Sequence, residues 1–297
     1  MQVYKAADLD NGGEVLRHLD PPARLAVFGD PVAHSASPPM HNAALRERGL
    51  LLQYVRIHVS PDEFPQALRS LPEAGFLGTN LTLPHKQSAL KSVDHASRES
   101  RLMGAINTVA VRGNELHGFN TDGPGLAAAV REEFLVGLES LRVLILGGAG
   151  GAGRAITVQC AVEGCPSVTV ANRDRRKGSK LADEINRELG TAVSSIPLEE
   201  HSLRNALSNA DLLINATPLG MKGDDPSPLP EGLVASGHLV YDTVYSGGTT
   251  ALLRQAQNAG AQSANGLSML LHQGAKAFEI WFGEPAPLET MRAALRS

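Results

Sequence analysis

A glycine-rich turn between an apolar strand and a helix does most to limit the folds open to this chain. The stretch "LRVLILGGAGGAGRAITVQCAVEG" begins as an apolar run, passes through glycines and continues as a helical pattern, and residues 148–153 fit the spacing G-x-G-x-x-G. Small residues let the backbone approach a pyrophosphate, and a helix N-terminus offers free N–H groups and partial positive charge. A tight turn with close helix packing would use the same residues, but the strand–turn–helix context favours a dinucleotide site.

The rest of the chain alternates between strand and helix patterns in two sections. This alternation is typical of an α/β fold with parallel sheets in two α/β layers. Strands are predicted at "RLAVFGD", "LQYVRIHV", "FLGTNLTLP", "SVTVAN", "LLINATP" and "HLVYDTVY", helices at "SPPMHNAALRERG", "SPDEFPQALRSLPEAG", "RRKGSKLADEINRELG" and "GLSMLLHQGAKAFEIWFG", and a hairpin turning at Gly113 and Asn114 within "AINTVAVRGNELHGFNTDG".

The 297 residues are enough for two domains, each with a core of its own. We expect an N-terminal extension over residues 1–23, a first α/β domain over 24–124 and a doubly wound dinucleotide-binding domain over 125–264. The helices of residues 265–297 are expected to pack back on the first domain. The polar extension is predicted to be a loosely ordered leader.

Composition excludes several functional classes. A net charge of −4 with 42% hydrophobic residues indicates no nucleic-acid or membrane surface, and no apolar run reaches the ~20 residues of a membrane span. Cys160 and Cys165 form a lone C-x4-C, which we interpret as two partly buried thiols in a reducing, cytoplasmic compartment. The ten histidines show no HExxH or comparable spacing, so no metal site is predicted.

The strand after the glycine-rich turn indicates which cofactor is bound. In NAD-binding domains an acid near the end of this strand bonds the ribose hydroxyls. Here "SVTVAN" ends at Asn172, and Arg173 follows. A base in place of the acid favours a 2′-phosphate, and therefore NADP.

Three segments of the first section carry more polar residues than their predicted elements need. "HSASP" places Ser35 and Ser37 just before a helix, where two hydroxyls suit a carboxylate, although helix capping would explain one of them. "NLTLPHK" places Thr82 and Lys86 around a proline, where a lysine could simply be solvated. "GFNTDG" sets Asp122 in a glycine-bounded loop, where a turn-forming role is the alternative.

Taken together, these segments make the chain similar to the shikimate dehydrogenase family over nearly its whole length. The resemblance implies reversible, NADP-dependent reduction of 3-dehydroshikimate to shikimate, a step in aromatic amino-acid biosynthesis. It also implies an N-terminal α/β substrate domain and a Rossmann-type domain with an active-site cleft between them. Eight motifs carry it, in the family's order and at about its spacing: "GDPVAHSASPPMHN", "GTNLTLPHK", "GAINT", "GFNTDGPG", "GGAGGAGRA", "NATPLGM", "DTVY" and "GLSMLLHQGAKAFEIW".

The resemblance assigns proton transfer to Lys86 and Asp122. A lysine ammonium can protonate the oxygen that gains charge as hydride reaches a ketone, and its neutral amine can accept a proton in reverse. A neighbouring carboxylate favours the charged lysine, whereas burial opposes it. The substrate-binding positions are Ser35, Ser37, Thr82, Asn107, Tyr245 and Gln273. The cofactor-binding positions are Gly148, Ala149, Gly150, Gly151, Ala152, Asn172, Arg173, Asp174, Lys177, Thr217, Met221 and Gly266.

Asp174 departs from the family pattern at the cofactor. Relatives that use NADP commonly have threonine or serine there, and a carboxylate would repel a phosphate. Aspartate is also a good N-cap, and a helix is predicted to begin at this point. If the carboxylate turns onto the helix N–H groups, the basic residues Arg173, Arg175, Arg176 and Lys177 outnumber it. We therefore predict that NADP is preferred, with weaker discrimination than usual.

Other departures lie outside the catalytic pair. Asn265 and Ser268 stand where many relatives have aspartate and glycine, and "YSGGTTALL" replaces a proline-containing stretch. These changes could tune substrate fit or closure.

Two alternative functions stay open. An NAD-dependent quinate/shikimate dehydrogenase shares nearly all the motifs, although the two serines with His41 and Asn42 favour shikimate. A non-catalytic metabolite-binding regulator would be expected to lack the lysine or the aspartate, and both are present. The predicted partner is a small-molecule substrate, with no nucleic acid and no membrane. The oligomeric state cannot be read from the sequence, and a homodimer stays open.

Overall fold

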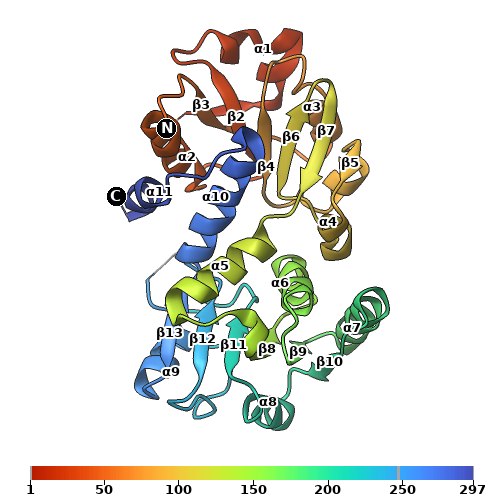
Figure 1. Ribbon diagram of the computed structural model, residues 1–297, viewed down its shortest axis with the longest axis vertical. Helices are drawn as coiled ribbons and strands as arrows, with labels where there is room; N and C mark the ends of the chain where they lie inside the picture. Colours follow the sequence, from red (N-terminus) through yellow and green to blue (C-terminus); the bar gives the residue numbers. More distant parts are fainter. Residues whose placement is uncertain (1, 246–247, 297) are drawn as a thin grey trace. The chain divides into compact units, whose positions relative to one another are not determined.

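The chain divides into two compact units, each with its own sheet. The computed structural model describes residues 2–245 and 248–296. The first unit comprises Met1–Thr121 with Leu271–Ser297, and the second comprises Asp122–Leu270. Figure 1 labels the elements of both. The predicted α/β fold class is confirmed.

The sheet of the first unit combines a parallel half with an antiparallel hairpin. Its order is β1-β3-β2-β4-β6-β7-β5. The first four of these strands run parallel, β6 is antiparallel to β4, and β7 is antiparallel to β6. The predicted hairpin is therefore confirmed, with Gly113 at a φ of 63° in its turn. The strands are β1 (Val3–Lys5), β2 (Ala23–Gly29), β3 (Gln53–His58), β4 (Gly78–Leu81), β5 (His95–Ala96), β6 (Thr108–Arg112) and β7 (Glu115–Phe119).

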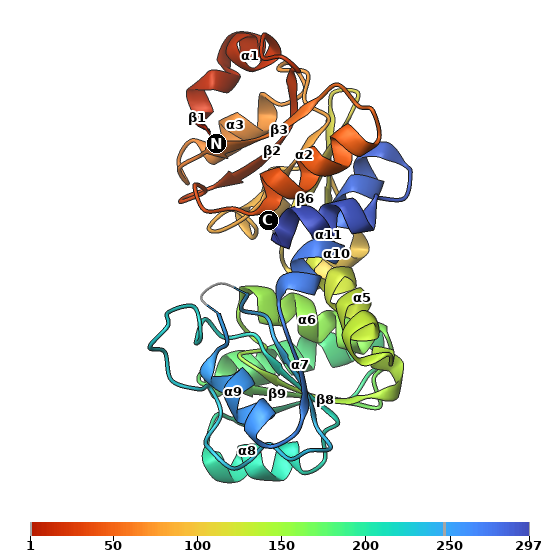
Figure 2. The same ribbon diagram turned by 90° about the vertical axis from the view of Figure 1, so that its left-hand side faces the viewer.

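Helices cover both faces of this sheet. Successive side chains of a strand point to opposite faces, so each strand contributes to two cores. In β2, Ala26 and Phe28 join a core with helices α1 and α3, whereas Leu25 and Val27 join a core with α2, α10 and α11. Figure 2 shows α2 and α11 side by side. The helices are η1 (Ala6–Leu9), α1 (Asp10–Arg17), α2 (Ser37–Glu47), α3 (Phe64–Arg69), η2 (Ser88–Lys91), α4 (Arg98–Met103), α10 (Leu267–Phe282) and α11 (Leu288–Arg296).

The residues from Val3 onward form regular, packed elements, so the expectation of a loosely ordered leader is wrong. Strand β1 pairs in parallel with β3 and extends the sheet. Leu9 and Leu16 are buried in the core beneath it. Polar residues dominate this segment, but a few apolar side chains at the right spacing are enough to dock it.

The second unit is built on a fully parallel sheet. Its order is β10-β9-β8-β11-β12-β13. This is the order 3-2-1-4-5-6 of doubly wound dinucleotide-binding domains, in which ligands bind where the order reverses, here between β8 and β11. The strands are β8 (Arg142–Leu146), β9 (Ser167–Asn172), β10 (Val193–Pro197), β11 (Leu212–Asn215), β12 (Leu239–Asp242) and β13 (Gln262–Asn265).

The helices of the second unit begin and end at residues suited to those positions. Asp174 caps α7 at its start, and Gly190 ends it in the left-handed conformation. The helices are α5 (Asp122–Phe134), η3 (Leu138–Ser140), α6 (Gly151–Val162), α7 (Arg175–Leu189), α8 (Glu200–Leu207) and α9 (Ala251–Asn258). Within the described residues, no helix combines the length and the apolar character that a membrane crossing needs.

Candidate active site

The polar residues predicted in the first unit gather at one edge of its sheet. Strands β2 and β4 run parallel, so their carboxyl ends meet at the same edge. Backbone hydrogen bonds join the segments that follow them: the Thr82 N–H donates to the Phe28 carbonyl (2.9 Å), and the Asp30 N–H to the Leu83 carbonyl (3.0 Å). The loop that carries Ser35 leaves from this edge.

Lys86 lies in a loop that is anchored on both sides. Its backbone carbonyl accepts a 2.8 Å hydrogen bond from the Ile106 N–H. The preceding His85 is buried, with its ring stacked on Phe64 at 4.5 Å and its Nε2 2.7 Å from the Val59 carbonyl. Burial lowers the pKa of His85, which keeps the ring neutral. The Lys86 side chain itself is half-buried. The loop therefore holds the lysine at a defined place on the edge.

Ser35 precedes α2 and Ser37 is its first residue, and neither serine acts as its side-chain cap. The N-cap residue is Ala36, and no side chain caps it. The Ser35 hydroxyl accepts a 3.3 Å bond from the Ser37 N–H. The Arg56 guanidinium donates two bonds to the Ser35 carbonyl, at 2.6 and 3.2 Å. This arginine was not predicted as a site residue, and it places a cation beside the two serines.

Asn107 lies where β6 begins, opposite the end of β4. Its Oδ1 accepts a 2.8 Å bond from the Thr121 N–H, and its Nδ2 donates to the Thr121 hydroxyl at 2.9 Å. The same Nδ2 lies 3.4 Å from Oε1 of Gln273, on α10. The structure thus brings two predicted substrate-binding residues together, and Asn107 is 2% exposed.

A buried polar network beneath Asn107 was not predicted. The Tyr54 hydroxyl donates to Asn80 Oδ1 (2.7 Å), Asn80 Nδ2 donates to the Thr108 hydroxyl (3.0 Å), and Thr108 donates to Asn107 Oδ1 (3.0 Å). Burial raises the pKa of Tyr54, so it remains a neutral donor. The signal was present in the sequence: Thr-Asn or Asn-Thr pairs interrupt the apolar runs of β4 and β6.

Asp122 begins helix α5, directly after Thr121. The residue is 7% exposed. Lys86 belongs to the first unit and Asp122 to the second, and their pairing stays a prediction.

The second unit contains a cavity at the point where its strand order reverses. Its volume is about 420 Å³. The cavity is lined by seven of the predicted cofactor-binding residues: Ala149, Gly150, Asn172, Arg173, Asp174, Lys177 and Thr217. Residues that the sequence analysis missed complete the lining: Gly147, Leu198, Ala216, Pro218 and Leu219. Pro218 and Leu219 lie inside the quoted "NATPLGM" stretch, whereas Leu198 follows a strand that was not predicted.

The glycine-rich turn shapes one wall of this cavity. A Cβ at Gly153 would overlap the Gly147 carbonyl oxygen, so only glycine allows α6 to start this close to β8. The first turn of α6 leaves backbone N–H groups without intrahelical acceptors. Gly148 instead packs toward Val170 and Thr157, and Gly151 is open on its Cβ side. The predicted residues Gly148, Gly151, Ala152, Met221 and Gly266 are not among those that line the cavity.

Asp174 turns its carboxylate onto the helix that follows. Its Oδ1 accepts hydrogen bonds from the N–H groups of Arg176 (3.0 Å) and Lys177 (3.3 Å). Asn172 Nδ2 donates to the Asp174 carbonyl at 2.7 Å. Of the two directions left open for the Asp174 carboxylate, the structure shows the one that caps α7.

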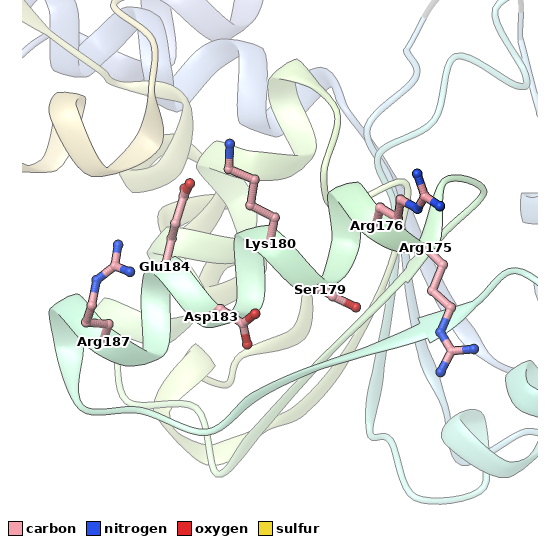
Figure 3. Close-up of a pocket in the computed structure, with 7 residues that line it drawn as sticks. All are labelled: Arg175, Arg176, Ser179, Lys180, Asp183, Glu184 and Arg187. Carbon is pink, nitrogen blue, oxygen red and sulfur yellow. The ribbon is translucent and has the colours of Figure 1, made fainter.

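Two of the four basic residues expected to outnumber Asp174 are not among those that line this cavity. Arg175 and Arg176 line a separate open hollow of about 840 Å³ along α7 (Figure 3). The other residues of this hollow come from the same helix and carry mixed charge, and Glu184 is paired with Arg154 at 2.8 Å. The cavity with Asp174 is thus lined by two cations, Arg173 and Lys177.

A buried aspartate fixes the segment that carries Thr217. Asp242 accepts bonds from Asn215 Nδ2 (2.9 Å) and the Thr250 hydroxyl (2.6 Å), and burial raises its pKa. Oδ1 of Asn215 accepts from both the N–H and the hydroxyl of Thr217. The asparagine thereby orients Thr217 at the cavity.

The residues that depart from the family pattern have structural partners. The Ser268 hydroxyl lies 3.0 Å from the Tyr241 hydroxyl, and Asn265 Oδ1 accepts from the Leu267 N–H at 3.0 Å. Tyr245 is 43% exposed, and partial burial raises its pKa. Ser246 and Gly247, in the "YSGGTTALL" stretch, lie outside the described residues.

The strand order, the glycine-rich turn at the switch point and the cations beside it define a dinucleotide-binding protein of the Rossmann class. Three family models match the chain: "Shikimate dehydrogenase substrate binding domain" over residues 27–109, "Shikimate / quinate 5-dehydrogenase" over 129–219 and "Shikimate 5'-dehydrogenase C-terminal domain" over 266–296. The chain belongs to the shikimate dehydrogenase family.

Relatives and solved structures agree with this assignment. Shikimate dehydrogenase (NADP(+)) of Methanopyrus kandleri is 40% identical over 273 residues, which are 91% of this chain and 94% of that protein. Shikimate 5-dehydrogenase from Thermus thermophilus, solved with NADP(H) and shikimate, has a TM-score of 0.82 at 39% identity, covering 92% of this chain and 98% of that one. Quinate dehydrogenase from Corynebacterium glutamicum, solved with NAD, has a TM-score of 0.82 at 29% identity and the same coverage. The predicted enzyme class and its NADP dependence are confirmed.

Proposed function

We propose that this chain catalyses the reversible, NADPH-dependent reduction of 3-dehydroshikimate to shikimate in aromatic amino-acid biosynthesis. The observation that carries the proposal is the conjunction of a phosphate-compatible cavity in one unit with a convergent polar edge in the other. Family membership supports the same reaction. The test is steady-state oxidation of shikimate by the purified protein with NADP, followed as NADPH absorbance.

In this proposal the edge of the first sheet binds the substrate. The hydroxyls of Ser35 and Ser37 hold its carboxylate, supported by the cation of Arg56 at the Ser35 backbone. Asn107 and Gln273, which already lie within 3.4 Å of each other, bind ring hydroxyls together with Thr82. A preformed set of donors on a rigid edge orients the ring without a large entropy cost at the moment of reaction.

Lys86 serves as the proton-transfer residue, with Asp122 as its partner. Reduction builds negative charge on the substrate's carbonyl oxygen, and the Lys86 ammonium donates its proton there. In the oxidative direction the neutral amine accepts the hydroxyl proton. The Asp122 carboxylate stabilises the charged lysine and orients it. The anchored loop around His85 supports this role, since it fixes the lysine's backbone.

The cavity of the second unit fits NADP. Glycines form its wall, and Arg173 and Lys177 provide positive charge for a 2′-phosphate. When bound, NADPH supplies the hydride. The residues of the chain position the dinucleotide: Thr217 is held by Asn215 at the cavity, and Tyr245 and Met221 are proposed to border the reacting rings.

One observation keeps an NAD-dependent quinate/shikimate dehydrogenase as the second candidate: an acidic residue, Asp174, is among the residues that line the cavity with the two cations. Comparing kcat/KM for shikimate and quinate, each with NADP and with NAD, decides between the two. The proposal expects the shikimate–NADP pair to be the fastest of the four. A higher value for quinate with NAD would contradict it.

We also propose that the protein works in the cytoplasm, with a homodimer as the oligomeric state to be tested. Cys160 and Cys165 are both free thiols, which suits a reducing compartment. Light scattering of the purified chain gives its molar mass, and a value of 31.3 kDa would indicate a monomer.

A further inference from the structure

Two histidines and a glutamate gather on strands β5 and β7, at the side of the first sheet where β5 is the outermost strand. Nε2 of His95 and Nε2 of His117 each lie 3.5 Å from Oε2 of Glu115. The two imidazole rings are 4.7 Å apart between centroids, and one ligand atom from each residue can be chosen so that all three lie within 4.8 Å of one another. None of the residues assigned above to substrate or cofactor belongs to this cluster.

Strand pairing explains why these residues meet. In the parallel pair of β5 and β7, His95 lies directly opposite His117. Glu115 precedes His117 by two positions on the same strand, so both side chains point to the same face of the sheet. Figure 1 shows β5 at the edge of the sheet beside β7. The backbone therefore holds three ligand types on one face before any ion binds.

We propose that His95, Glu115 and His117 bind a divalent transition-metal ion, with Zn²⁺ as the reference ion. Two imidazole nitrogens and one carboxylate oxygen form a known zinc ligand set, with water in the fourth position. Ligand atoms at about 2.0–2.2 Å from a tetrahedral ion stand roughly 3.3–3.6 Å apart, a range that includes the observed separations of 3.5 Å. One nitrogen of each histidine lies within 4.8 Å of the other, and small side-chain rotations can bring these two atoms to the same separation.

The neighbouring charged groups are engaged elsewhere. Arg112 lies directly opposite Glu115 in the antiparallel pair of β6 and β7. Its guanidinium, however, lies over the Phe119 ring, 5.6 Å from the centroid. Asp94, next to His95 in the sequence, accepts from Arg69 (2.7 Å) and from the Leu116 N–H (2.8 Å). These contacts leave the face of the cluster to its three ligands.

The absence of metal-ligand spacing in the sequence does not exclude this site. A search for two histidines a few positions apart cannot find it, because His95 joins Glu115 and His117 only through strand pairing. Strand β5 is two residues long and lies at the edge of the sheet. A bound ion would tie this short strand to β7, so binding should stabilise the first unit.

Calorimetric titration of the metal-free protein with Zn²⁺ tests the proposal. The expected result is one ion per chain, with affinity lowered roughly tenfold or more in His95→Ala and in His117→Ala. His201→Ala is the matched control: this exposed histidine lies on α8 and should leave binding unchanged. His95 is 57% exposed, so its variant is expected to fold normally.

Two further readouts separate a built site from loose surface binding. Co²⁺ should give the visible absorption of a tetrahedral ion in the wild type and lose it in His95→Ala. Zn²⁺ should raise the melting temperature of the wild type and of His201→Ala but not of the cluster variants. Equal zinc binding by all four proteins, or no one-to-one binding by the wild type, would overturn the proposal. Shikimate oxidation should not need the ion, because the ligands take no part in the proposed reaction.

Discussion

The two candidate sites are held in place by different means. At the carboxyl ends of the strands of the first sheet, side chains are held by hydrogen bonds to other side chains. Asn107 is bonded to Thr121 and Thr108, and Thr108 is bonded to Asn80. In the second unit, the backbone forms most of the site, through a glycine-rich turn, a helix N-terminus and a cap. A ring with several hydroxyls requires donors at fixed positions, whereas a pyrophosphate can be bound by N–H groups that any sequence provides. The first site should therefore depend on side-chain identity, and the second on backbone shape and charge.

The largest effect is expected at Lys86, where a side chain is proposed to perform the chemistry. Lys86→Ala should lower kcat by roughly 10²–10⁴-fold, because a positioned proton donor contributes about that much. KM for shikimate should change far less. Steady-state kinetics measure both, with Lys91→Ala as the control, since this exposed lysine lies on the neighbouring η2.

Asp122→Asn sharpens the same prediction. The amide keeps the shape but not the charge, so kcat should fall while the fold persists. Near wild-type turnover in either the Lys86 or the Asp122 variant would remove that residue from the mechanism. A rise in KM at constant kcat would make it a binding residue instead.

The next effect concerns His41, which is buried beneath the first site. Its ring stacks on Tyr54 at 4.5 Å, and both ring nitrogens lack a hydrogen-bond partner within the described residues. Burial lowers the pKa of His41 from 6.5 to about 3. The folded state therefore binds this proton less readily than the unfolded state, so the group's contribution is complete above pH 6.5 and falls as the pH drops toward 3.

Unfolding by urea at pH 6.5 and pH 4.5 measures this contribution. The wild type should lose about 2 kcal/mol more between these pH values than His41→Phe, which keeps a ring but cannot titrate. Trp281, the single tryptophan, lies 5.3 Å from the His41 ring and reports the first unit by its fluorescence. His201→Phe should keep the wild-type loss. An equal loss in His41→Phe would show that the buried ring is not the titrating group.

A smaller loss of stability is expected at Asn107. Replacement by alanine leaves the buried Thr121 N–H without its acceptor, and each such group costs about 1–3 kcal/mol. Denaturant unfolding followed by Trp281 fluorescence measures this loss, with the exposed Asn258→Ala as the control. KM for shikimate should rise as well. A variant as stable as the wild type would mean that the first site does not depend on its side-chain network.

The same difference between the sites decides what the sequence could predict. Strands β8, β9, β11 and β12 were predicted because apolar runs report buried parallel strands. The glycine-rich turn and the cap at Asp174 were predictable because each is local, using residues that lie within a few positions of one another.

What failed depends on contacts between distant residues or on weak patterns. Strands β10 and β13 are short and polar, so no apolar run marks them. Strand β1 has only three residues and was assigned to a loosely ordered leader. Arg56 reaches Ser35 through tertiary packing, which no local pattern encodes. The direction of Arg175 and Arg176 depends on helix phase, which a count of charges ignores.

The smallest effect, at Asp174, tests whether charge controls the backbone-built site. Threonine retains the capping oxygen for α7 but removes the negative charge from the cavity. Asp174→Thr should raise the ratio of kcat/KM for NADP over NAD by roughly 3–10-fold, or about 0.7–1.4 kcal/mol. Asp183→Thr is the matched control, because Asp183 lies on the same helix but lines the separate hollow (Figure 3), and it should leave the ratio unchanged. If both variants shift the ratio equally, the net charge of α7 sets cofactor preference. If neither does, the capping bonds already neutralise the carboxylate, and Arg173 and Lys177 alone set the preference.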